Sequence, residues 1–294
     1  MTAAIIAQQT VNGIVLGSPY VLVALGLTLI YGVLVQINFA HADFVTVGAF
    51  CAYFFMQIVG GSYLVSIAVA LIAGGVLGWL INISIFAPLR RRGGELSPLI
   101  ATIGVSVMLQ NAMLAWLGPV PYVFETPYSQ QVFRVAGIFF TMQSVIIIAV
   151  SSITVALLYA FMKFTFLGKA LRAVSQDYET AGLMGINPGQ LITLTFVLAS
   201  ALAGMGGAML APVLVLTPFA GASVIVKAFA IVIIGGFGNV EGTILAGLLV
   251  GLIESFTTQF LAPGLIDIVV FGLLLTMLAF RPTGLVAERR EENV

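Results

Sequence analysis

The stretch "LIYGVLVQINFAHADFVTVGAF", residues 29 to 50, is apolar at both ends and polar in its middle. It carries an amide (Asn38), the only histidine of the chain (His41) and a carboxylate (Asp43) within six residues. A charge near the centre of a bilayer costs at least roughly 2.5 to 3.5 kcal/mol, so such residues should face protein or a water-filled path. The stretch therefore predicts a junction where one helix ends and the next begins.

The composition is that of a membrane protein. Hydrophobic residues make up 61% of the 294 residues and charged residues only 7%, against about 25% charged in soluble domains. The 11 basic and 11 acidic residues cancel, which leaves no basic face for nucleic acid. The single cysteine, Cys51, cannot form an internal disulfide. The amino terminus lacks the features of a secretory signal, so we expect the first apolar run to remain in the mature protein.

The apolar runs predict an all-α, polytopic transmembrane helix bundle, because a spanning helix needs about 20 apolar residues. Nine runs are present: 11–35, 42–59, 63–88, 97–117, 138–162, 190–211, 223–236, 241–260 and 264–281. The run 223–236 is short, holds Lys227 and ends in two glycines, so it could be a half-helix. We expect eight to ten helices in a single transmembrane domain that covers residues 1–294.

The basic residues predict the sidedness, because short loops rich in Lys and Arg stay in the cytoplasm. Nine of the 11 basic residues lie at three places, which are 90–92, 163–172 and 281–290. We expect these three places inside, and the amino terminus and the loop 118–137 outside. That loop is rich in proline and aromatic residues, which indicates an ordered external loop rather than a linker.

Small residues four apart predict close packing between helices of this chain. These pairs are Gly13 with Gly17, Gly74 with Gly78, Ala203 with Gly207, and Gly247 with Gly251. A weak internal repeat is a further prediction, because segments 31–50 and 235–254 each place two glycines sixteen residues apart around a polar kink. Transporters often carry broken helices at matching positions in two halves.

The longest inside loop, 163–190, predicts a short helix outside the bilayer. Ser175 can cap it, Asp177 and Glu179 lie in its first turn, and Gly185 can be its left-handed stop. Two interpretations remain open at this point, a solvated linker helix and a docking element for a cytoplasmic partner.

Three regions resemble signature regions of a known family, in order and in spacing along the whole chain. They read "GLTLIYGVLVQINFAHADFVTVGAF", "LGKALRAVSQDYETAGLMGIN" and "IIGGFGNVEGTILAGLLVGLIES". They are similar to the branched-chain amino acid ABC transporter permeases of the LivH type. The chain departs from that pattern at Ala42, where the family usually has glycine, and at Gln36, where a small residue is common, which leaves the exact substrate open.

The resemblance implies that the inside loop is a version of the permease "EAA" loop, whose short helix sits in a cleft of the ATPase subunit. The coupling residues would then be Arg172, Asp177, Glu179, Ala181 and Gly185. It also implies the partners: a homologous second permease subunit, two cytoplasmic ATP-binding-cassette ATPases and an external or periplasmic solute-binding protein. The setting would be the lipid of a bacterial or archaeal cytoplasmic membrane.

The chain has no ATPase motif of its own. Its only Gly-Lys pair, Gly168-Lys169, is followed by alanine and lacks the upstream glycine of a P-loop. We therefore expect a permease that is not an enzyme and that depends on separate ATPases. We expect no cofactor, and no metal site either, since one histidine and a nearby carboxylate are too few ligands.

Two roles are open for Asn38, His41 and Asp43: they could cap the broken helices, or they could line the translocation pathway. The same choice applies to Glu254 in a late span, between the pathway and a paired helix contact. Lys227 could pair with Glu254 or with Asp267, or it could extend toward the interface.

The leading hypothesis is one permease subunit of an ATP-driven importer for leucine, isoleucine and valine. Urea, short amides and aromatic acids are alternative cargo within the same family. A self-sufficient secondary transporter or channel is a hypothesis from another class, and it predicts uptake by this chain alone. A structural subunit of an enzyme complex is a third, and it would need more cofactor ligands than this chain offers.

Overall fold

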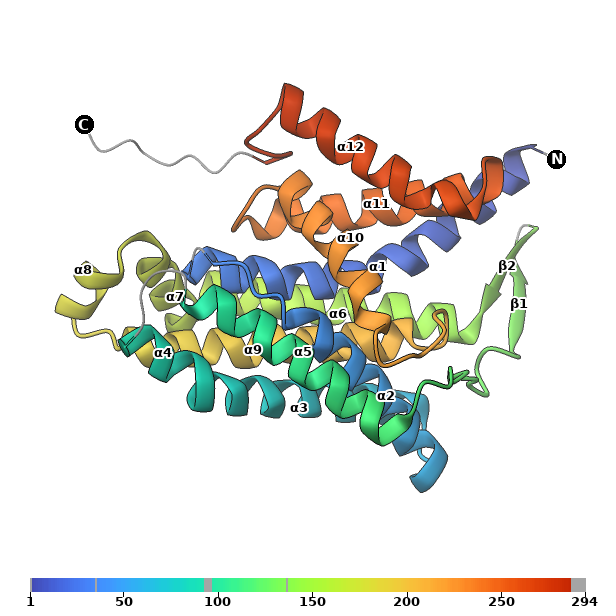
Figure 1. The fold of residues 1–294 in the computed structure, drawn as a ribbon. Helices are drawn as coiled ribbons and strands as arrows, with labels where there is room; N and C mark the ends of the chain where they lie inside the picture. Colours follow the sequence, from blue (N-terminus) through green and yellow to red (C-terminus); the bar gives the residue numbers. More distant parts are fainter. Residues whose placement is uncertain (1, 35, 93–96, 136, 287–294) are drawn as a thin grey trace.

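The computed structural model describes residues 2–34, 36–92, 97–135 and 137–286, and it is a bundle of helices (Figure 1). Within these residues, eight helices are long and apolar enough to cross a membrane. The doubtful run 223–236 forms a ninth apolar helix of only 16 residues. The predicted all-α polytopic bundle with one half-helix is therefore confirmed.

The elements follow the predicted runs closely. The long helices are α1 (Thr2–Leu34), α2 (His41–Val59), α3 (Tyr63–Ile81), α5 (Ser97–Leu117), α6 (Met142–Phe164), α9 (Pro188–Leu210), α11 (Val240–Phe260) and α12 (Ile266–Phe280). The shorter elements are a π-turn (Asn82–Phe86), a 3-10 turn (Pro263–Leu265), α4 (Ala87–Arg92), α7 (Phe166–Gln176), α8 (Tyr178–Leu183) and α10 (Ala220–Gly235).

The first helix is longer than expected. It begins at Thr2 rather than near Val11, because polar residues before the apolar run find partners in the fold. The side-chain amide of Gln8 bonds the backbone of Phe139 in both directions, at 3.0 and 2.8 Å. Gln9 Nε2 donates to Gln259 Oε1 on α11 at 2.9 Å. These contacts extend the helix past the apolar run.

The bundle has two chemically different ends. The amino terminus and a hairpin of β1 (Val132–Val135) and β2 (Ile138–Thr141) lie at one end, the hairpin end (Figure 1). The helices α4, α7 and α8 lie at the other, the basic end. Residues 118–135 of the loop 118–137 carry β1 of this hairpin and join the bundle through a bridge between Tyr122 and Leu216. Of the three predicted basic places, 90–92 and 163–172 therefore share the basic end, and Arg289 and Arg290 of the third lie outside the described residues.

Glycine contacts hold the centre of the bundle together. A Cβ atom added to Gly48 of α2 would overlap the backbone of Gly204 in α9, and one added to Gly251 of α11 would overlap Gly17 in α1. A Cβ atom added to Gly74 of α3 would likewise overlap the backbone of α9. The prediction that small-residue pairs pack within the chain is confirmed.

Two helices begin inside the bundle rather than at its ends. After α1 ends at Leu34, the chain turns back along it, and α2 begins at His41 beside Val23 of α1. Val23 precedes Leu34 by 11 residues, which places this start about 16 Å inside the basic end. The start of α10 meets the same region, because Gly221 N donates to Thr46 Oγ1 at 2.9 Å.

The structure shows an internal repeat, but between other segments than 31–50 and 235–254, which were predicted from their glycines. The broken pair α1 and α2 is followed by α3, and the broken pair α9 and α10 is followed by α11, with each counterpart running in the opposite direction. The contacts match as well, since α1 packs on α11 through Gly17 and Gly251, and α9 packs on α3 through Gly204 and Gly74. The glycines of 235–239 instead form a tight turn between α10 and α11.

Packing at Gly48 gives the first testable prediction. Gly48→Ala should lower the free energy of unfolding by about 1 to 3 kcal/mol, because its new Cβ has only backbone to displace. The measurement is the thermal midpoint and yield of the purified protein in detergent. Gly104→Ala on α5 is the control, since no heavy atom lies within 4 Å of the added Cβ. Equal loss in the two variants would contradict this packing.

Candidate functional site

Asn38 satisfies the backbone at the break between α1 and α2. Its buried side chain accepts a hydrogen bond from Ala40 N through Oδ1 at 3.1 Å. Its own carbonyl accepts from His41 N at 3.3 Å. Asn38 therefore bonds backbone groups that the break leaves free, as a capping role would require.

His41 ties the start of α2 to the middle of α1. Its ring is fully buried, and Nε2 lies 3.1 Å from the carbonyl oxygen of Val23. A carbonyl can only accept, so Nε2 carries the hydrogen of this bond. Gly26 of α1 makes room for the ring, because an added Cβ there would meet His41 Cε1 at 2.7 Å.

Asp43 lies in the first turn of α2, as predicted, where the helix dipole favours a negative charge. Its side chain is buried and faces Ser106 and Gln110 of α5. Among the described residues, Asp43 Oδ2, His41 Nδ1 and Asn38 Nδ2 have no hydrogen-bond partner. These three buried atoms therefore take no part in the hydrogen bonds that hold the helix starts.

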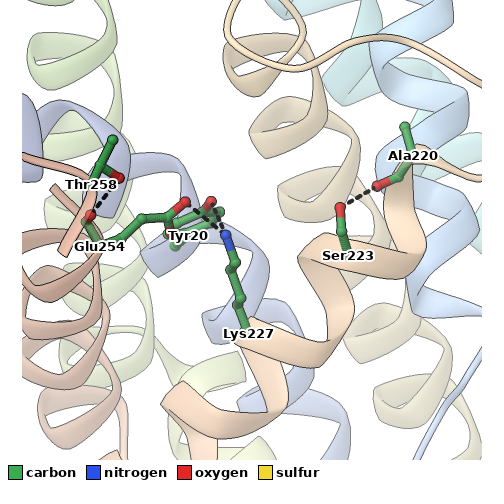
Figure 2. Close-up of polar contacts among 6 residues, drawn as sticks. All are labelled: Tyr20, Ala220, Ser223, Lys227, Glu254 and Thr258. Carbon is green, nitrogen blue, oxygen red and sulfur yellow. Dashed lines mark hydrogen bonds and ion pairs between the residues drawn. The ribbon is translucent and has the colours of Figure 1, made fainter. Parts of the chain in front are cut away.

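A second polar site joins α1, α10 and α11. Figure 2 shows the side chains of Lys227 of α10, Tyr20 and Glu254 together, with the Lys227 ammonium bonded to the other two. Lys227 Nζ lies 2.7 Å from Glu254 Oε1 and donates to Tyr20 Oη at 3.2 Å. Glu254 is thus the partner of Lys227, whereas Asp267 is exposed on α12. Of the alternatives left open for Lys227, the structure shows the pairing with Glu254.

Sequence reasoning missed the aromatic residues that accompany these polar sites. Tyr20 holds Lys227, and Tyr31 contacts Phe237 with ring centroids 4.2 Å apart. Tyr31, Phe237 and Phe229 line a narrow cavity that also touches Asn38. Tyr20 and Tyr31 are eleven residues apart, which places them on one face of α1. This spacing is the feature of the sequence that could have indicated them.

The inside loop differs from the prediction in its capping residue. Asp177, not Ser175, caps the short helix: Asp177 Oδ1 accepts from Glu179 N at 2.9 Å and from Thr180 N at 3.0 Å. Ser175 belongs to the last turn of α7, where its hydroxyl donates to Arg172 O at 2.7 Å. The loop holds two helices rather than one, because the extended backbone of Asp177 separates α7 from α8.

The cap charge is itself stabilised. Hydrogen bonds from the Thr180 hydroxyl and backbone, and then from Glu179 N, hold the pKa of Asp177 below its ordinary value. A lowered folded pKa stabilises α8 above the unfolded pKa, and the contribution is lost as pH falls through the folded pKa. The cap is therefore fully charged at neutral pH.

The predicted left-handed stop at Gly185 is present, with φ at 84°. Ile186 N donates to Ala181 O at 3.2 Å, which closes the end of α8. The side chains of Leu183 and Met184 are 88% and 79% exposed. The loop thus presents a firmly capped helix with an uncovered apolar tip.

A multi-pass bundle with two interior helix starts, a part-buried ion pair between its helices and an exposed capped helix fits the class of membrane transport proteins. A family model described as "Branched-chain amino acid transport system / permease component" matches residues 9–278. The chain belongs to this family.

Curated relatives cover nearly the whole chain. The permease protein BraD of Pseudomonas aeruginosa is 33% identical over 98% of this chain and 97% of its own length. LivH of Escherichia coli K12 is 32% identical over the same shares. The probable LivH of Methanocaldococcus jannaschii is 29% identical over 94% of this chain and 89% of its own. Their names describe branched-chain amino acid transport permeases, and no solved structure matches this chain.

The role of Asn38 in the break gives the second testable prediction. Asn38→Ala should lower the stability of the protein by the roughly 0.5 to 2 kcal/mol expected of a lost cap, because Ala40 N loses its acceptor. Asn38→Ser keeps a shorter acceptor and should lose less. The yield and thermal midpoint of the purified protein report the difference. Wild-type values for Asn38→Ala would show that this bond is not needed.

Proposed function

We propose that the chain is the transmembrane permease subunit of an ATP-binding-cassette importer for branched-chain amino acids in the cytoplasmic membrane. The observation that carries this proposal is the similarity to BraD and LivH over nearly the full length of both chains. Eight apolar helices of spanning length agree with a multi-pass membrane protein. A self-sufficient secondary transporter or channel is not favoured, since these relatives are named as components of transport systems.

The proposed coupling element is the loop 163–190, with α8 docking into the ATPase. The exposed apolar tip of α8 supports this role, because Leu183 and Met184 lack cover within the described chain. Asp177 and Gly185 fix the two ends of the helix, and Glu179 and Ala181 lie within it. Arg172 donates to Met162 O at 2.6 Å, which ties the loop to α6.

The partners follow from the same role. Two cytoplasmic ATPases would supply the energy, a homologous second permease would complete the transmembrane pair, and an external solute-binding protein would deliver the cargo. The exposed apolar side chains of the hairpin, among them Val132, Phe133 and Val135, offer that protein a surface. In this arrangement residues 1–294 form one permease domain, with 118–137 outside.

The polar residues inside the bundle would have two tasks. Asn38 and His41 hold the interior helix starts through the bonds described above. Their unpartnered atoms, with those of Asp43 and Glu254, are buried in this structure and would bond solute or water when a pathway opens beside them. We place these four residues on or beside the translocation path.

Reconstitution tests the proposal directly. The chain, its neighbouring permease, both ATPases and the binding protein should take up leucine into proteoliposomes only when ATP is present. The chain alone should give no uptake under a proton or sodium gradient. Uptake by the chain alone would overturn the importer role.

Gly185 gives the third testable prediction. Gly185→Val should strain the left-handed position by about 1 kcal/mol or more, and thereby weaken ATPase assembly or uncouple ATP hydrolysis from uptake. The measurements are co-purification of the ATPases and the ratio of leucine uptake to ATP hydrolysed. Gly189→Ala is the control, because its added Cβ would make only an ordinary contact of 3.5 Å. Normal coupling in Gly185→Val would remove this role from the loop.

Sidedness gives the fourth testable prediction. In a Cys51→Ala background, a cysteine at the exposed position Gln130 should react with an impermeant thiol reagent in intact cells. A cysteine at Ser175 should react only after permeabilisation, because the basic end is expected to face the cytoplasm. The reverse pattern would invert the topology.

A further inference from the structure

The ion pair of Lys227 and Glu254 lies at the edge of an exposed face of α10. Ala222, Ser223 and Val226 are exposed on this helix, and Phe229 is half-buried one turn further on. Residues three and four apart share one side of a helix, so they form a continuous strip. Phe39, from the break before α2, extends the strip with its ring centroid 6.0 Å from that of Phe229.

The pair lies beside this strip and is partly exposed. The side chains of Lys227 and Glu254 are 13% and 11% exposed, so neither is sealed inside the bundle. Ser223 lies one helical turn before Lys227, and its hydroxyl is occupied by Ala220 O at 3.0 Å (Figure 2). A solute on this face would therefore meet the charged pair as its principal polar feature.

The pair also leaves bonding capacity unused. Lys227 Nζ has three donors, and its bonds to Glu254 Oε1 and Tyr20 Oη use two of them. Glu254 Oε2 is buried and has no partner among the described residues. A contact that served only to hold α10 against α11 would be expected to satisfy both oxygens, because an unpaired buried acceptor is destabilising. The free oxygen points to a ligand with donors.

We propose that Lys227 and Glu254 bind the two charged ends of a zwitterionic amino acid as it passes along this face. The proposal rests on the importer function proposed above. The internal ion pair opens, Lys227 binds the carboxylate of the cargo, and Glu254 binds its ammonium group. One ion pair is exchanged for two, so no charge is left without a partner during the passage.

The surroundings match such a cargo. Tyr20 keeps contact with Lys227 when the pair opens, since the ammonium lies 5.3 Å from the centre of the Tyr20 ring and is attracted by its face. Val226, Phe229 and Phe39 offer apolar surface to a branched aliphatic side chain. The pair therefore selects zwitterionic amino acids over urea and uncharged amides, which lack both charges.

A doubly neutral variant tests this proposal in the complete complex. Lys227→Met combined with Glu254→Gln removes both charges at similar volume, so a purely structural pair would be replaced without leaving a lone charge. We expect complex yield and binding-protein-stimulated ATP hydrolysis to stay within about twofold of wild type, and leucine uptake to fall by about tenfold or more. Thr276→Ala on α12 is the control with unchanged uptake, because its exposed hydroxyl bonds only Gly272 O of its own helix, at 2.7 Å, away from this strip. Wild-type uptake in the double variant would overturn the proposal.

A second measurement does not depend on how well that variant assembles. In a Cys51→Ala background, Ser223→Cys is labelled with a charged methanethiosulfonate reagent in the complex without binding protein. Leucine at high concentration should slow labelling by roughly threefold or more, and 4-methylpentanamide, which has the same side chain but no charges, should not. Equal rates with both compounds would overturn the proposal. Absence of ATP-dependent leucine uptake in the wild-type complex would instead overturn the importer function itself.

Discussion

Every amide and carbonyl group of the backbone inside a bilayer needs a partner within the protein, because lipid offers none. This constraint governs the two helices that begin inside the bundle. Asn38 accepts from Ala40 N before α2, and Thr46 of α2 accepts from Gly221 N at the start of α10. The two interior starts are therefore joined to each other, and His41 joins them to α1. Polar residues that look misplaced in an apolar run are what make the breaks possible.

Close backbone packing provides the frame around these breaks. Glycines bring α1 against α11 and α9 against α2 and α3, at distances that leave no room for a Cβ atom. The same frame leaves one side of α10 uncovered and places Lys227 where it meets Glu254 and Tyr20. A charged pair near lipid is thus confined to the contact of three helices, at the rim of an exposed apolar strip.

The basic end connects this interior to the proposed ATPase contact. The helix α8 ends at Leu183, with Gly185 as its left-handed stop, and α9 begins at Pro188 with Asn187 as its cap. The same α9 packs against α1, α2 and α3. In the importer proposed above, a displacement of α8 would pass along α9 to the helices that form the interior break.

The sequence by itself determined the membrane class, the spans and the short α10, because apolar length and glycine content depend only on local composition. It also indicated the left-handed stop at Gly185, since only a glycine fits there without strain. Only the tertiary structure decided which side chains meet inside the bundle. Lys227 pairs with Glu254 and not with Asp267, and Tyr20 completes the site. Residues 20, 227 and 254 are far apart in the chain, and no local pattern encodes which helices meet. Asp177 displaced Ser175 as the cap for a related reason, since capping depends on where the backbone becomes extended.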